Sequence, residues 1–514
     1  MSRASKYPGG VPRSINYPEI PLYSFLENSA RKFPGRDAII FYGRRLTYSR
    51  TWEETRRLAG ALRGLGLSKG DRVGLLMPNI PQFVIGYYAT LYAGGVVVAV
   101  NPLNPNEEIE RELSETDVKI LLVLDRFLDK IQVKEGRKTI VAEPEAYLPD
   151  QVKMFSRLRR GSFRVPSGLL SFEELTKGRP LEAKAEIDPR RDLAAIQYTG
   201  GTTGTPKGVM LTHFSLVANA LQASYWLRGW GFSAKPQPAG WPVVACAVPF
   251  FHIYGMTVAM NEGTQFGSTL VLVPDPKPPA IMRAIERFEA THFPAIPLMI
   301  RGIVEHNDAG RFDLTSLTSC VSGGARINRE IAKKFVEITG AQLFQGYGLT
   351  EAGPVTHCTA LEDNLASESA GLPFPDTEAK IVDLQTGEIE LGAGQEGELI
   401  VRGPQVMAGY WRDAEATAKA LRNGWLHTGD VALVDETGHL YIVDRKQDQI
   451  IASGHTVWPS SVEEAINAHP SVEMAAVLGA PDPLKCATEV KAFVKINHGW
   501  DERLAREELL EHCR

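Results

Sequence analysis

The sequence predicts an α/β fold with largely parallel sheets, arranged in at least two domains. A chain of 514 residues is longer than one hydrophobic core usually organises. From residue 38 to about residue 350, short apolar runs alternate with helix-length amphipathic stretches, the pattern of strands joined by helical crossovers. After residue 370 glycine-punctuated β segments replace this alternation. We predict a large N-terminal domain, residues 1–445, with two α/β subdomains and a β-rich subdomain, and a small α+β C-terminal domain, residues 446–514.

The α/β part opens with a predicted hairpin and a helix. AIIFYG (38–43) and RLTYS (45–49) each predict a short strand, and a glycine turn separates them. In the next stretch, TWEETRRLAGALRGLGL (51–67), apolar residues share one helical face, at Trp52, Leu58, Ala59 and Leu62. We therefore expect an amphipathic helix that packs on a sheet.

The same rhythm continues along the chain. Strands and helices are predicted in alternation at DRVGLLM (71–77), a helix near 80–93, GGVVVAVN (94–101), a polar helix near 106–116, and DVKILLVL (117–124). Residues 125–190 are more polar and irregular, and we expect them to wrap the surface. A second α/β rhythm runs from residue 192 to about residue 350.

The C-terminal part has a different texture. Three β segments are predicted in the β-rich subdomain: AKIVD (379–383), GELIVRG (397–403) and GHLYIVD (438–444). From about residue 447 the pattern is helix, strand, strand, carried by PSSVEEAINAHPSVEMAAVLGAPD (459–482) and KAFVKI (491–496). This order predicts a small separate α+β domain.

Charge and cysteine usage narrow the classes of partner and the compartment. The formal net charge of −5 gives no basic face for nucleic acid, so we predict no nucleic-acid partner. The five cysteines are scattered and form no C-x-x-C pair, which predicts reduced thiols. The N-terminus lacks a signal-type apolar segment, and no apolar run approaches the roughly 20 residues that span a bilayer. We predict a cytoplasmic protein, with peripheral membrane contact and a homodimer left open.

One glycine-rich stretch, YTGGTTGTPKG (198–208), predicts a polyphosphate site. Glycines let consecutive backbone N–H groups converge on an anion, threonine hydroxyls add donors, and Lys207 adds a positive charge. The P-loop pattern needs Ser or Thr directly after the lysine, whereas Gly208 follows here. The competing interpretation is a mobile turn between two strands.

Four motifs together resemble a known family. YTGGTTGTPKGVMLTH (198–213), QGYGLTEAG (345–353), GWLHTGD (424–430) and DRKQDQIIASG (444–454) occur in the order and spacing of the adenylate-forming superfamily. That superfamily includes acyl-CoA synthetases, luciferases and peptide-synthetase adenylation domains, and the similarity is closest to the fatty-acyl-CoA and coumarate-CoA ligase branch. The resemblance implies that the two α/β subdomains are doubly wound and that the C-terminal domain is mobile.

The resemblance also implies a reaction. In this family a carboxylate attacks the α-phosphate of MgATP, and a thiol, usually that of coenzyme A, then displaces AMP from the acyl-adenylate. The stretch WPVVACAVPFFHIYGMTVAM (241–260) contains no charged residue, which favours an apolar acid over an amino acid. We predict an ATP-dependent, Mg²⁺-requiring ligase that joins a medium- or long-chain fatty acid to CoA. The alternatives are an aryl or coumarate-type acid, a carrier protein as acceptor, and a degenerate acyl-adenylate binding module.

By resemblance, the glycine-rich stretch binds the β- and γ-phosphates of ATP. The residues implied are Thr199, Gly201, Thr202, Thr203, Gly204 and Lys207.

The second and third motifs supply the remaining nucleotide contacts by resemblance. Tyr347 stacks on adenine, Thr350 touches phosphate and Glu351 helps to hold Mg²⁺, a cation that prefers oxygen ligands. Asp430 accepts hydrogen bonds from the ribose hydroxyls, and Arg445 adds a ribose or phosphate contact. A solvated loop acid is the competing interpretation of Glu351.

The acyl site is implied by two further segments. In PFFHIYG, His252 either orients the acid or gates its tunnel. In SGGARI, Gly324 and Ala325 leave room for ligand, and Gly346 and Gly348 fit the same picture of an open tunnel. Close backbone packing is the competing interpretation of these small residues.

The sequence departs from the family pattern in three places. Gln447 stands where relatives carry Asp or Lys at the hinge. Gly454 borders the pantetheine tunnel by resemblance, but the neighbouring residues differ, at His455, Thr456 and Trp458. The sequence stops at EELLEHCR, before the lysine motif with which relatives end, and we expect that it is an incomplete version of a longer protein.

Overall fold

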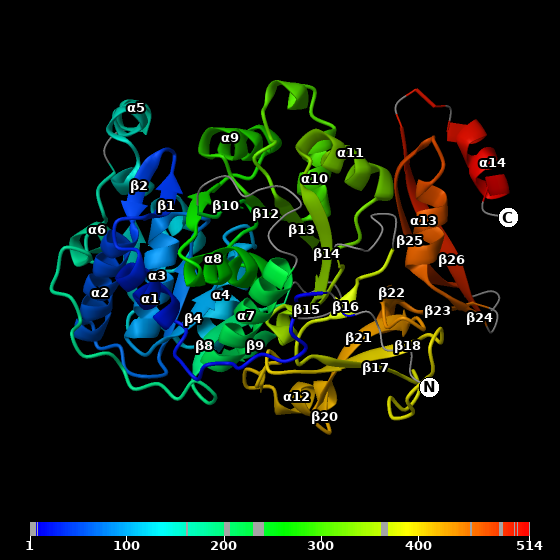
Figure 1. Ribbon diagram of the computed structural model, residues 1–514, viewed down its shortest axis with the longest axis horizontal. Coiled ribbons are helices and arrows are strands. Elements are labelled where there is room, and N and C mark those ends of the chain that lie inside the picture. Colours follow the sequence, from blue (N-terminus) through cyan, green and yellow to red (C-terminus); the bar gives the residue numbers. More distant parts are fainter. Residues whose placement is uncertain are drawn as a thin grey trace. The chain divides into compact units, whose positions relative to one another are not determined.

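The computed structural model forms two compact units (Figure 1). It describes residues 7, 9–160, 163–199, 206–229, 241–360, 368–452, 455–482, 487–497, 499, 500 and 502–512. We call the described residues up to Glu378, together with Arg402–Leu421, the two-sheet unit. Ala379–Val401 and the described residues from Arg422 onward form the β-rich unit.

The first sheet of the two-sheet unit has eight strands. In spatial order they are β19 (Gly409–Tyr410), β9 (Gly208–Thr212), β8 (Leu193–Tyr198), β4 (Val96–Ala99), β3 (Arg72–Leu76), β5 (Val118–Leu124), β6 (Lys138–Ala142) and β7 (Leu170–Ser171). The strands from β8 to β7 are parallel, whereas β9 runs antiparallel to both of its neighbours. Because β3 lies between β4 and β5, the chain winds first to one side and then to the other. This sheet is therefore doubly wound, as predicted.

The second sheet has nine strands and the same winding. In spatial order they are β16 (Leu372–Pro373), β15 (Val355–Cys358), β14 (Gln342–Gly348), β13 (Ser319–Gly323), β12 (His292–Ala295), β10 (Val243–Cys246), β11 (Thr269–Leu272), β1 (Asp37–Phe41) and β2 (Arg44–Thr47). The strands from β14 to β1 are parallel, and β10 lies between β11 and β12. The point at which the winding reverses is thus the carboxyl end of β10.

Helices and short turns connect these strands. The α-helices of the two-sheet unit are α1 (Ser24–Lys32), α2 (Tyr48–Gly64), α3 (Pro81–Tyr92), α4 (Asn106–Glu115), α5 (Asp150–Arg160), α6 (Phe172–Leu175), α7 (His213–Gly229), α8 (Glu262–Gln265), α9 (Pro278–Phe288), α10 (Pro297–Val304), α11 (Arg329–Thr339) and α12 (Ala414–Ala420). Shorter or differently wound turns are η1 (Asp125–Lys130), η2 (Pro144–Tyr147), η3 (Gly255–Asn261), η4 (Ala309–Arg311) and η5 (Thr350–Ala352).

The packing of two helices follows directly from their sequences. In α2, the N-cap Thr47 accepts a hydrogen bond from the Arg50 amide, and Leu58, Ala59 and Leu62 are fully buried, as the apolar spacing predicts. By contrast, α3 is apolar all round and every one of its residues is buried. A buried hydrogen bond of 2.9 Å from the Tyr88 hydroxyl of α3 to Asn261 ties this helix to η3.

The β-rich unit contains three small sheets. β17 (Glu378–Val382), β18 (Gly397–Arg402), β21 (Trp425–Val434) and β20 (Leu421–Arg422) lie side by side, and β22 (Leu440–Arg445) pairs with β21. Two hairpins follow, β23 (Ile450–Ala452) with β24 (His455–Val457) and β25 (Val472–Asp482) with β26 (Ala487–Ile496). The helical elements are η6 (Lys446–Asp448), α13 (Pro459–Asn467) and α14 (Glu502–His512). A small apolar cluster of Ile450, Ile466, Val472, Ala475, Val477 and Leu509 forms a core of its own.

The structure corrects one sequence expectation. Residues 125–190 do not only wrap the surface, because β6 (KTIVA) is an inner strand of the eight-stranded sheet, between β5 and β7. Its last four residues are buried by this pairing, although polar segments surround the strand in the sequence. Neither sheet is built from one continuous part of the chain. The hairpin β1–β2 near the N-terminus belongs to the nine-stranded sheet, whereas β8 and β9, which follow residue 190, belong to the eight-stranded sheet.

Candidate active site

The segment PFFHIYG lies at the point where the nine-stranded sheet reverses its winding, just after β10. In doubly wound sheets, ligands bind at the carboxyl ends of the strands around such a point. Asn79, which is buried just after β3, fixes this segment by three hydrogen bonds. Its side chain accepts from the Phe250 amide at 2.7 Å and donates to the carbonyls of Cys246 and Val248 at 2.9 Å each. The corresponding points of the two sheets are thereby joined.

His252 is held by its own local backbone. Its Nδ1 accepts a hydrogen bond of 3.2 Å from the Tyr254 amide, and its carbonyl accepts from the Met256 amide. Although the side chain keeps contact with solvent, the protein atoms around the ring lower the pKa of His252 below its usual value by desolvation. A neutral imidazole at this position can orient a carboxylate through Nε2, the nitrogen left for a ligand.

The apolar segment after His252 is the turn η3, which is wound as a π-helix and completely buried. Such wider turns are rare and occur often at functional sites. Gly255 at its start has no room for a side chain, because an added Cβ would lie 2.3 Å from the Pro249 carbonyl oxygen. Tyr254 donates a hydrogen bond of 2.7 Å to the Val321 carbonyl on β13, which ties this segment to the neighbouring strand end.

Three predicted small residues differ in what surrounds them. Gly324 follows β13 with a φ of +88°, and an added Cβ there would meet only Ile296, at 3.8 Å, so the space beside it is open. Gly346 has ordinary contacts at 3.6 Å and beyond. Gly348 is different, since its added Cβ would lie 2.0 Å from the Pro354 carbonyl oxygen. Close backbone packing thus accounts for Gly348 but not for Gly324.

Ala325 and Tyr347 lie near the carboxyl ends of two adjacent parallel strands, β13 and β14. Ala325 is exposed just beyond β13, and Tyr347 is half-buried near the end of β14, where Gly323 pairs with Gly346. The Tyr347 ring lies 6.0 Å from the ring of His357, measured between centroids. An aromatic ring near the carboxyl end of a strand can stack on a flat ligand.

Thr199 and Lys207 lie opposite one another at the two ends of the glycine-rich loop. The Thr199 amide donates to the Lys207 carbonyl at 3.1 Å, and the Lys207 amide donates to the Thr199 hydroxyl at 3.2 Å. The other four predicted loop residues, Gly201, Thr202, Thr203 and Gly204, lie outside the described residues, as does Gly454 of the predicted pantetheine site. Within the described part of the chain, Lys207 forms no ion pair with a carboxylate, so its charge is available to an anion.

The C-terminal end of α4 holds both ends of this loop. The Tyr198 hydroxyl donates to Glu115 Oε2 at 3.0 Å, and Arg111 Nη1 donates to the Pro206 carbonyl at 3.4 Å. Arg111 and Glu115 themselves form an ion pair of 3.2 Å, one helical turn apart. The residues that precede and follow the loop are therefore fixed to one rigid element.

Lys207, Tyr410 and Glu351 form a chain of contacts. The ammonium of Lys207 lies 5.1 Å from the centroid of the Tyr410 ring, and the Tyr410 hydroxyl donates a hydrogen bond of 2.8 Å to Glu351 Oε1. Glu351 belongs to the short turn η5 with Thr350, and its carbonyl accepts from the Met407 amide at 2.8 Å. A cationic and an anionic side chain are thus separated by one aromatic ring.

A hydrogen bond links the loop region to the segment PFFHIYG. Gln197, the residue before Tyr198 on β8, donates from Nε2 to the Phe251 carbonyl at 2.8 Å. The two-sheet unit therefore brings together Thr199, Lys207 and Glu351 on one side and His252 on the other. Gln197, Asn79, Glu115 and Tyr410 had no signal in the sequence, because each acts through contacts between distant segments.

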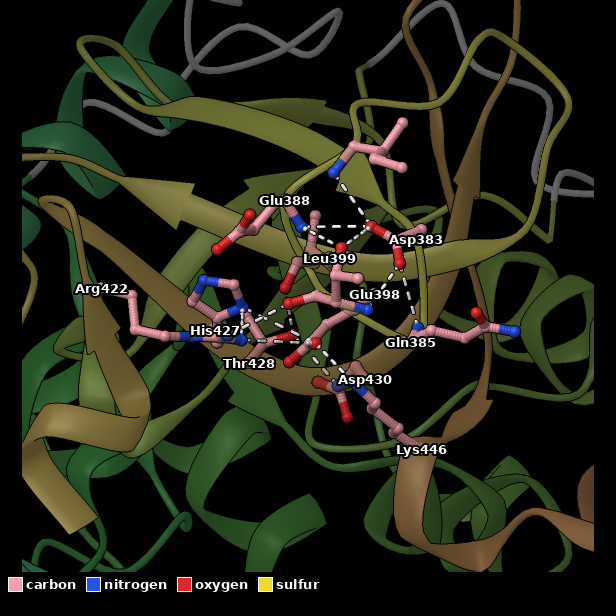
Figure 2. Close-up of polar contacts among 12 residues, drawn as sticks. Asp383, Gln385, Glu388, Glu398, Leu399, Arg422, His427, Thr428, Asp430 and Lys446 are labelled. Atoms are coloured by element: carbon pink, nitrogen blue, oxygen red, sulfur yellow. Dashed lines mark hydrogen bonds and ion pairs between the residues drawn. The ribbon is translucent and has the colours of Figure 1, made fainter. Parts of the chain in front are cut away.

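In the β-rich unit, Asp430 and Arg445 face each other on adjacent strands. They are register partners of β21 and β22, and Arg445 Nε lies 2.8 Å from Asp430 Oδ1. The Asp430 side chain is almost fully buried, whereas about half of Arg445 is exposed. Thr428 accepts a hydrogen bond from the Asp430 amide and donates to the Leu399 carbonyl, which fixes the strand locally (Figure 2).

Next to this pair, three basic side chains lie within 4.0 Å of the buried carboxylate of Glu398. Figure 2 shows Glu398 between His427 and Lys446. Lys446 Nζ lies 2.8 Å from Glu398 Oε2, His427 Nδ1 lies 3.6 Å away and Arg422 Nη2 lies 4.0 Å away. Desolvation and the neighbouring Arg422 charge lower the pKa of His427, against the opposing effect of Glu398. Since Lys446 follows Arg445, this ion pair anchors the segment that carries Arg445.

The carboxylates described above suit a metal ion that is bound mainly by the phosphate oxygens of a substrate. No group of three or more His, Cys, Asp or Glu in the described parts of the chain could hold a metal ion. Mg²⁺ in phosphate sites needs only one or two protein carboxylates, since phosphate oxygens and waters complete its shell. Glu351, within one ring of Lys207, fits such a single-carboxylate contact. Among the described helices none combines the length and apolar character needed to cross a bilayer.

Comparison with known proteins gives a family and several relatives. The AMP-binding enzyme family matches residues 26–411, and the AMP-binding enzyme C-terminal domain matches residues 461–514. A long-chain-fatty-acid–CoA ligase of Bacillus subtilis (strain 168) is 39% identical over 96% of this chain and 89% of its own. The 4-coumarate–CoA ligase 4 of Arabidopsis thaliana is 33% identical over 89% of this chain and 78% of its own.

A solved structure of similar fold binds ATP. The crystal structure of ATP-bound MatB from Rhodopseudomonas palustris superimposes with a TM-score of 0.76 at 26% identity, covering 96% of this chain and 92% of that one. The fold is therefore shared with a protein whose structure was solved with ATP bound.

Proposed function

Because the chain belongs to the AMP-binding enzyme family, we propose that it is an AMP-forming ligase that joins a medium- or long-chain fatty acid to coenzyme A. The observation that carries this proposal is the convergence of Lys207, Tyr410 and Glu351 beside the glycine-rich loop, in one unit with His252. The relative from Bacillus subtilis, which is named for this activity, supports the same substrate class.

In the first step, an oxygen of the fatty-acid carboxylate attacks the α-phosphorus of ATP. A bond forms between that oxygen and phosphorus, and the bond to the bridging oxygen of pyrophosphate breaks. Two anions must meet, so positive charge and backbone donors have to neutralise the phosphates. We assign this role to Lys207 and Thr199, with the predicted loop residues Gly201, Thr202, Thr203 and Gly204. Thr350 adds a phosphate contact, and Glu351 holds Mg²⁺, which supplies charge at the phosphates when bound.

In the second step, the sulfur of CoA attacks the acyl carbon. A thioester bond forms, the bond from the acyl carbon to the AMP oxygen breaks, and the thiol proton passes to water. We propose that Gly454 borders the pantetheine arm during this step. A carrier protein as acceptor would use the same chemistry. The positions beside Gly454 that depart from the family pattern are His455, Thr456 and Trp458, whereas Gln447 is the departure at the hinge.

The adenine and ribose contacts are assigned to residues of the second, third and fourth motifs. We propose that Tyr347 stacks on adenine, that Asp430 accepts hydrogen bonds from the ribose hydroxyls, and that Arg445 adds a ribose or phosphate contact. The buried Asp430 carboxylate and its ion pair with Arg445 support this assignment, because a fixed acceptor recognises a vicinal diol well.

The acyl chain is assigned to the apolar region around η3. We propose that His252 orients the carboxylate and that the open space beside Gly324 and Ala325, with Gly346, borders the ligand. The uncharged stretch 241–260 supports an apolar acid. A coumarate-type aryl acid is the second candidate, since the Arabidopsis relative is named for that substrate.

Residues 446–514 are proposed to be a separate, mobile C-terminal domain. The small apolar cluster formed only from residues 450–509 supports a domain with its own core. The match of the family's C-terminal domain to residues 461–514 supports the same division.

We also propose a cytoplasmic location, where ATP and CoA are supplied, with peripheral membrane contact. Three free, buried cysteines, Cys246, Cys320 and Cys358, support a reducing compartment. A homodimer is kept as a candidate assembly.

The test is pyrophosphate release from MgATP with acetate, octanoate, palmitate, coumarate and amino acids, with and without CoA. The proposal expects release that depends on an apolar acid and that CoA accelerates. Separately, synthetic palmitoyl-adenylate is offered with CoA, which tests the second step alone. Preference for coumarate would select the second candidate. No turnover in either assay, with ATP still bound, would make the protein a binding module and overturn the proposal.

A further inference from the structure

The helix α5 presents an apolar face that no described part of the protein covers. Three of its first six residues are exposed apolar side chains: Val152 at 40%, Met154 at 58% and Phe155 at 64% exposure. Phe163, just beyond the helix, is 36% exposed. Leu103 and Leu298, by contrast, are exposed apolar residues that stand singly in the sequence. A cluster of this kind marks an interaction surface rather than the scattered exposure of an ordinary protein surface.

The helix stands at the periphery of the two-sheet unit. Its main contact is with the short turn η2, and the Lys153 amide donates to the Pro149 carbonyl where the helix begins. Figure 1 shows α5 in cyan, at an outer edge of this unit. The exposed face is therefore accessible to a large, flat partner.

The charge of the same segment differs in sign from that of the chain. Residues 150–164 contain five basic residues, Lys153, Arg157, Arg159, Arg160 and Arg164, and one acidic residue, Asp150, for a net charge of +4. The whole chain carries −5. A short helix with exposed Val, Met and Phe and several Arg and Lys is typical of a segment that lies in the headgroup region of a bilayer.

We propose that α5 docks the protein on anionic lipid bilayers, with Val152, Met154 and Phe155 inserted among the acyl chains. At eleven residues the helix is too short to cross a bilayer, so the association is peripheral. An acidic protein would match the charge alone, but the exposed apolar side chains favour a lipid surface. The purpose of this docking rests on the proposed function, because a fatty acid partitions into membranes and a docked enzyme takes it from there.

Vesicle co-sedimentation tests the docking independently of catalysis. The purified protein is mixed with phosphatidylcholine vesicles, and with vesicles that contain about 30% phosphatidylglycerol. We expect sedimentation with the anionic vesicles, little with the neutral ones, and loss in about 0.5 M salt. The double variant Met154→Ser/Phe155→Ser should weaken binding about ten-fold or more, because each side chain loses its burial in lipid.

Matched variants separate docking from general damage. Ile389→Ser, at a residue 63% exposed in the β-rich unit, should bind like the unchanged protein. Lys153→Glu should weaken binding and Lys153→Arg should retain it, which keeps the test valid if the double variant fails to fold. Acyl-CoA formation in detergent, without vesicles, should be unchanged in all four variants, so failure of docking and failure of the proposed activity are distinguishable.

Three results would overturn the proposal. The first is equal binding by the Met154→Ser/Phe155→Ser variant, and the second is equal binding to neutral and anionic vesicles. The third is faster sedimentation of the unchanged protein than of the Met154→Ser/Phe155→Ser variant when no vesicles are present. Such self-association would assign the apolar face to a second copy of this chain.

Discussion

The Tyr410 hydroxyl donates a hydrogen bond of 2.8 Å to Glu351, while the Tyr410 ring lies 5.1 Å from the Lys207 ammonium. Tyr410 thus contacts both Lys207, which we assign to the phosphates of ATP, and Glu351, which we assign to Mg²⁺. Burial and the Glu351 charge raise the pKa of Tyr410 above its usual value, so the hydroxyl keeps its proton and remains a donor.

Removal of this hydroxyl should loosen the metal contact without removing it. Tyr410→Phe keeps the ring beside Lys207 but leaves Glu351 free to rotate. We expect the Mg²⁺ concentration for half-maximal pyrophosphate release to rise about three- to ten-fold, the effect of one hydrogen bond to a charged group. Tyr225→Phe, at an exposed tyrosine, is the control. An unchanged Mg²⁺ dependence would separate Tyr410 from the metal site.

Asn79 is expected to affect binding of the fatty acid more than binding of ATP. Asn79→Ala removes the partner of the Phe250 amide and of the Val248 carbonyl, a cost of about 1–3 kcal/mol for each group that stays buried. The Cys246 carbonyl still accepts from the Val273 amide. We expect a lower Tm and a KM for the acid that rises more than the KM for ATP. Asn497→Ala removes two less buried hydrogen bonds to backbone carbonyls in the β-rich unit and should leave both KM values unchanged. Equal effects on both substrates would argue against the assignment.

Asp430 should act on ATP affinity. Asp430→Asn removes the charge that pairs with Arg445 while its size is kept. We expect the KM for ATP to rise about ten-fold or more, because charged hydrogen bonds contribute about 1.5–3 kcal/mol. The control is Glu436→Gln, at an exposed turn carboxylate of the same unit. Direct titration of ATP by calorimetry measures the effect, and an unchanged dissociation constant for ATP would exclude Asp430 from the ribose site.

Glu112 gives the protein a defined pH dependence. Desolvation on α4 raises the pKa of this carboxyl to about 8, and Asn104 donates a hydrogen bond to it. The unfolded chain loses the proton near the ordinary pKa of 4.5, whereas the folded chain keeps it. The folded state therefore loses stability as the pH rises from about 4.5 to about 8, by up to about 1.4 kcal/mol per pH unit.

The variant Glu112→Gln should abolish this loss, because the amide is neutral at every pH and still accepts from Asn104. We expect a higher Tm than that of the unchanged protein at pH 7.5, by about 2 °C or more, and little difference at pH 5. Glu107→Gln, at an exposed position of the same helix, should change neither value. A gain that is equal at both pH values would mean that Glu112 does not titrate with folding.

The elements with strong local signals were predictable from the sequence. The hairpin β1–β2 and the helix α2 follow from a glycine turn and from apolar residues on one helical face, and both are confirmed. The strand β6 was missed, because its five residues stand among polar segments and its burial comes from pairing with β5 and β7.

The residues of the candidate site also divide into those that the sequence predicts and those that it does not. Motif residues such as Lys207 and Glu351 could be named from the sequence, because particular chemistry needs particular residue types. Their supports could not, since Glu115, Gln197 and Tyr410 are ordinary residues until the fold places them beside the loop. The glycines show the limit most clearly: Gly324 and Gly348 look alike in the sequence, and only packing distinguishes open space from a tight backbone contact.

The central claim is tested most directly by the stoichiometry of one reaction. The protein is incubated with palmitate, MgATP and CoA, and the products are quantified by mass spectrometry. The account predicts AMP, pyrophosphate and palmitoyl-CoA in equal amounts, with the yield falling about 100-fold or more in Lys207→Ala. Formation of ADP and phosphate, or AMP release that requires no acid, would contradict it.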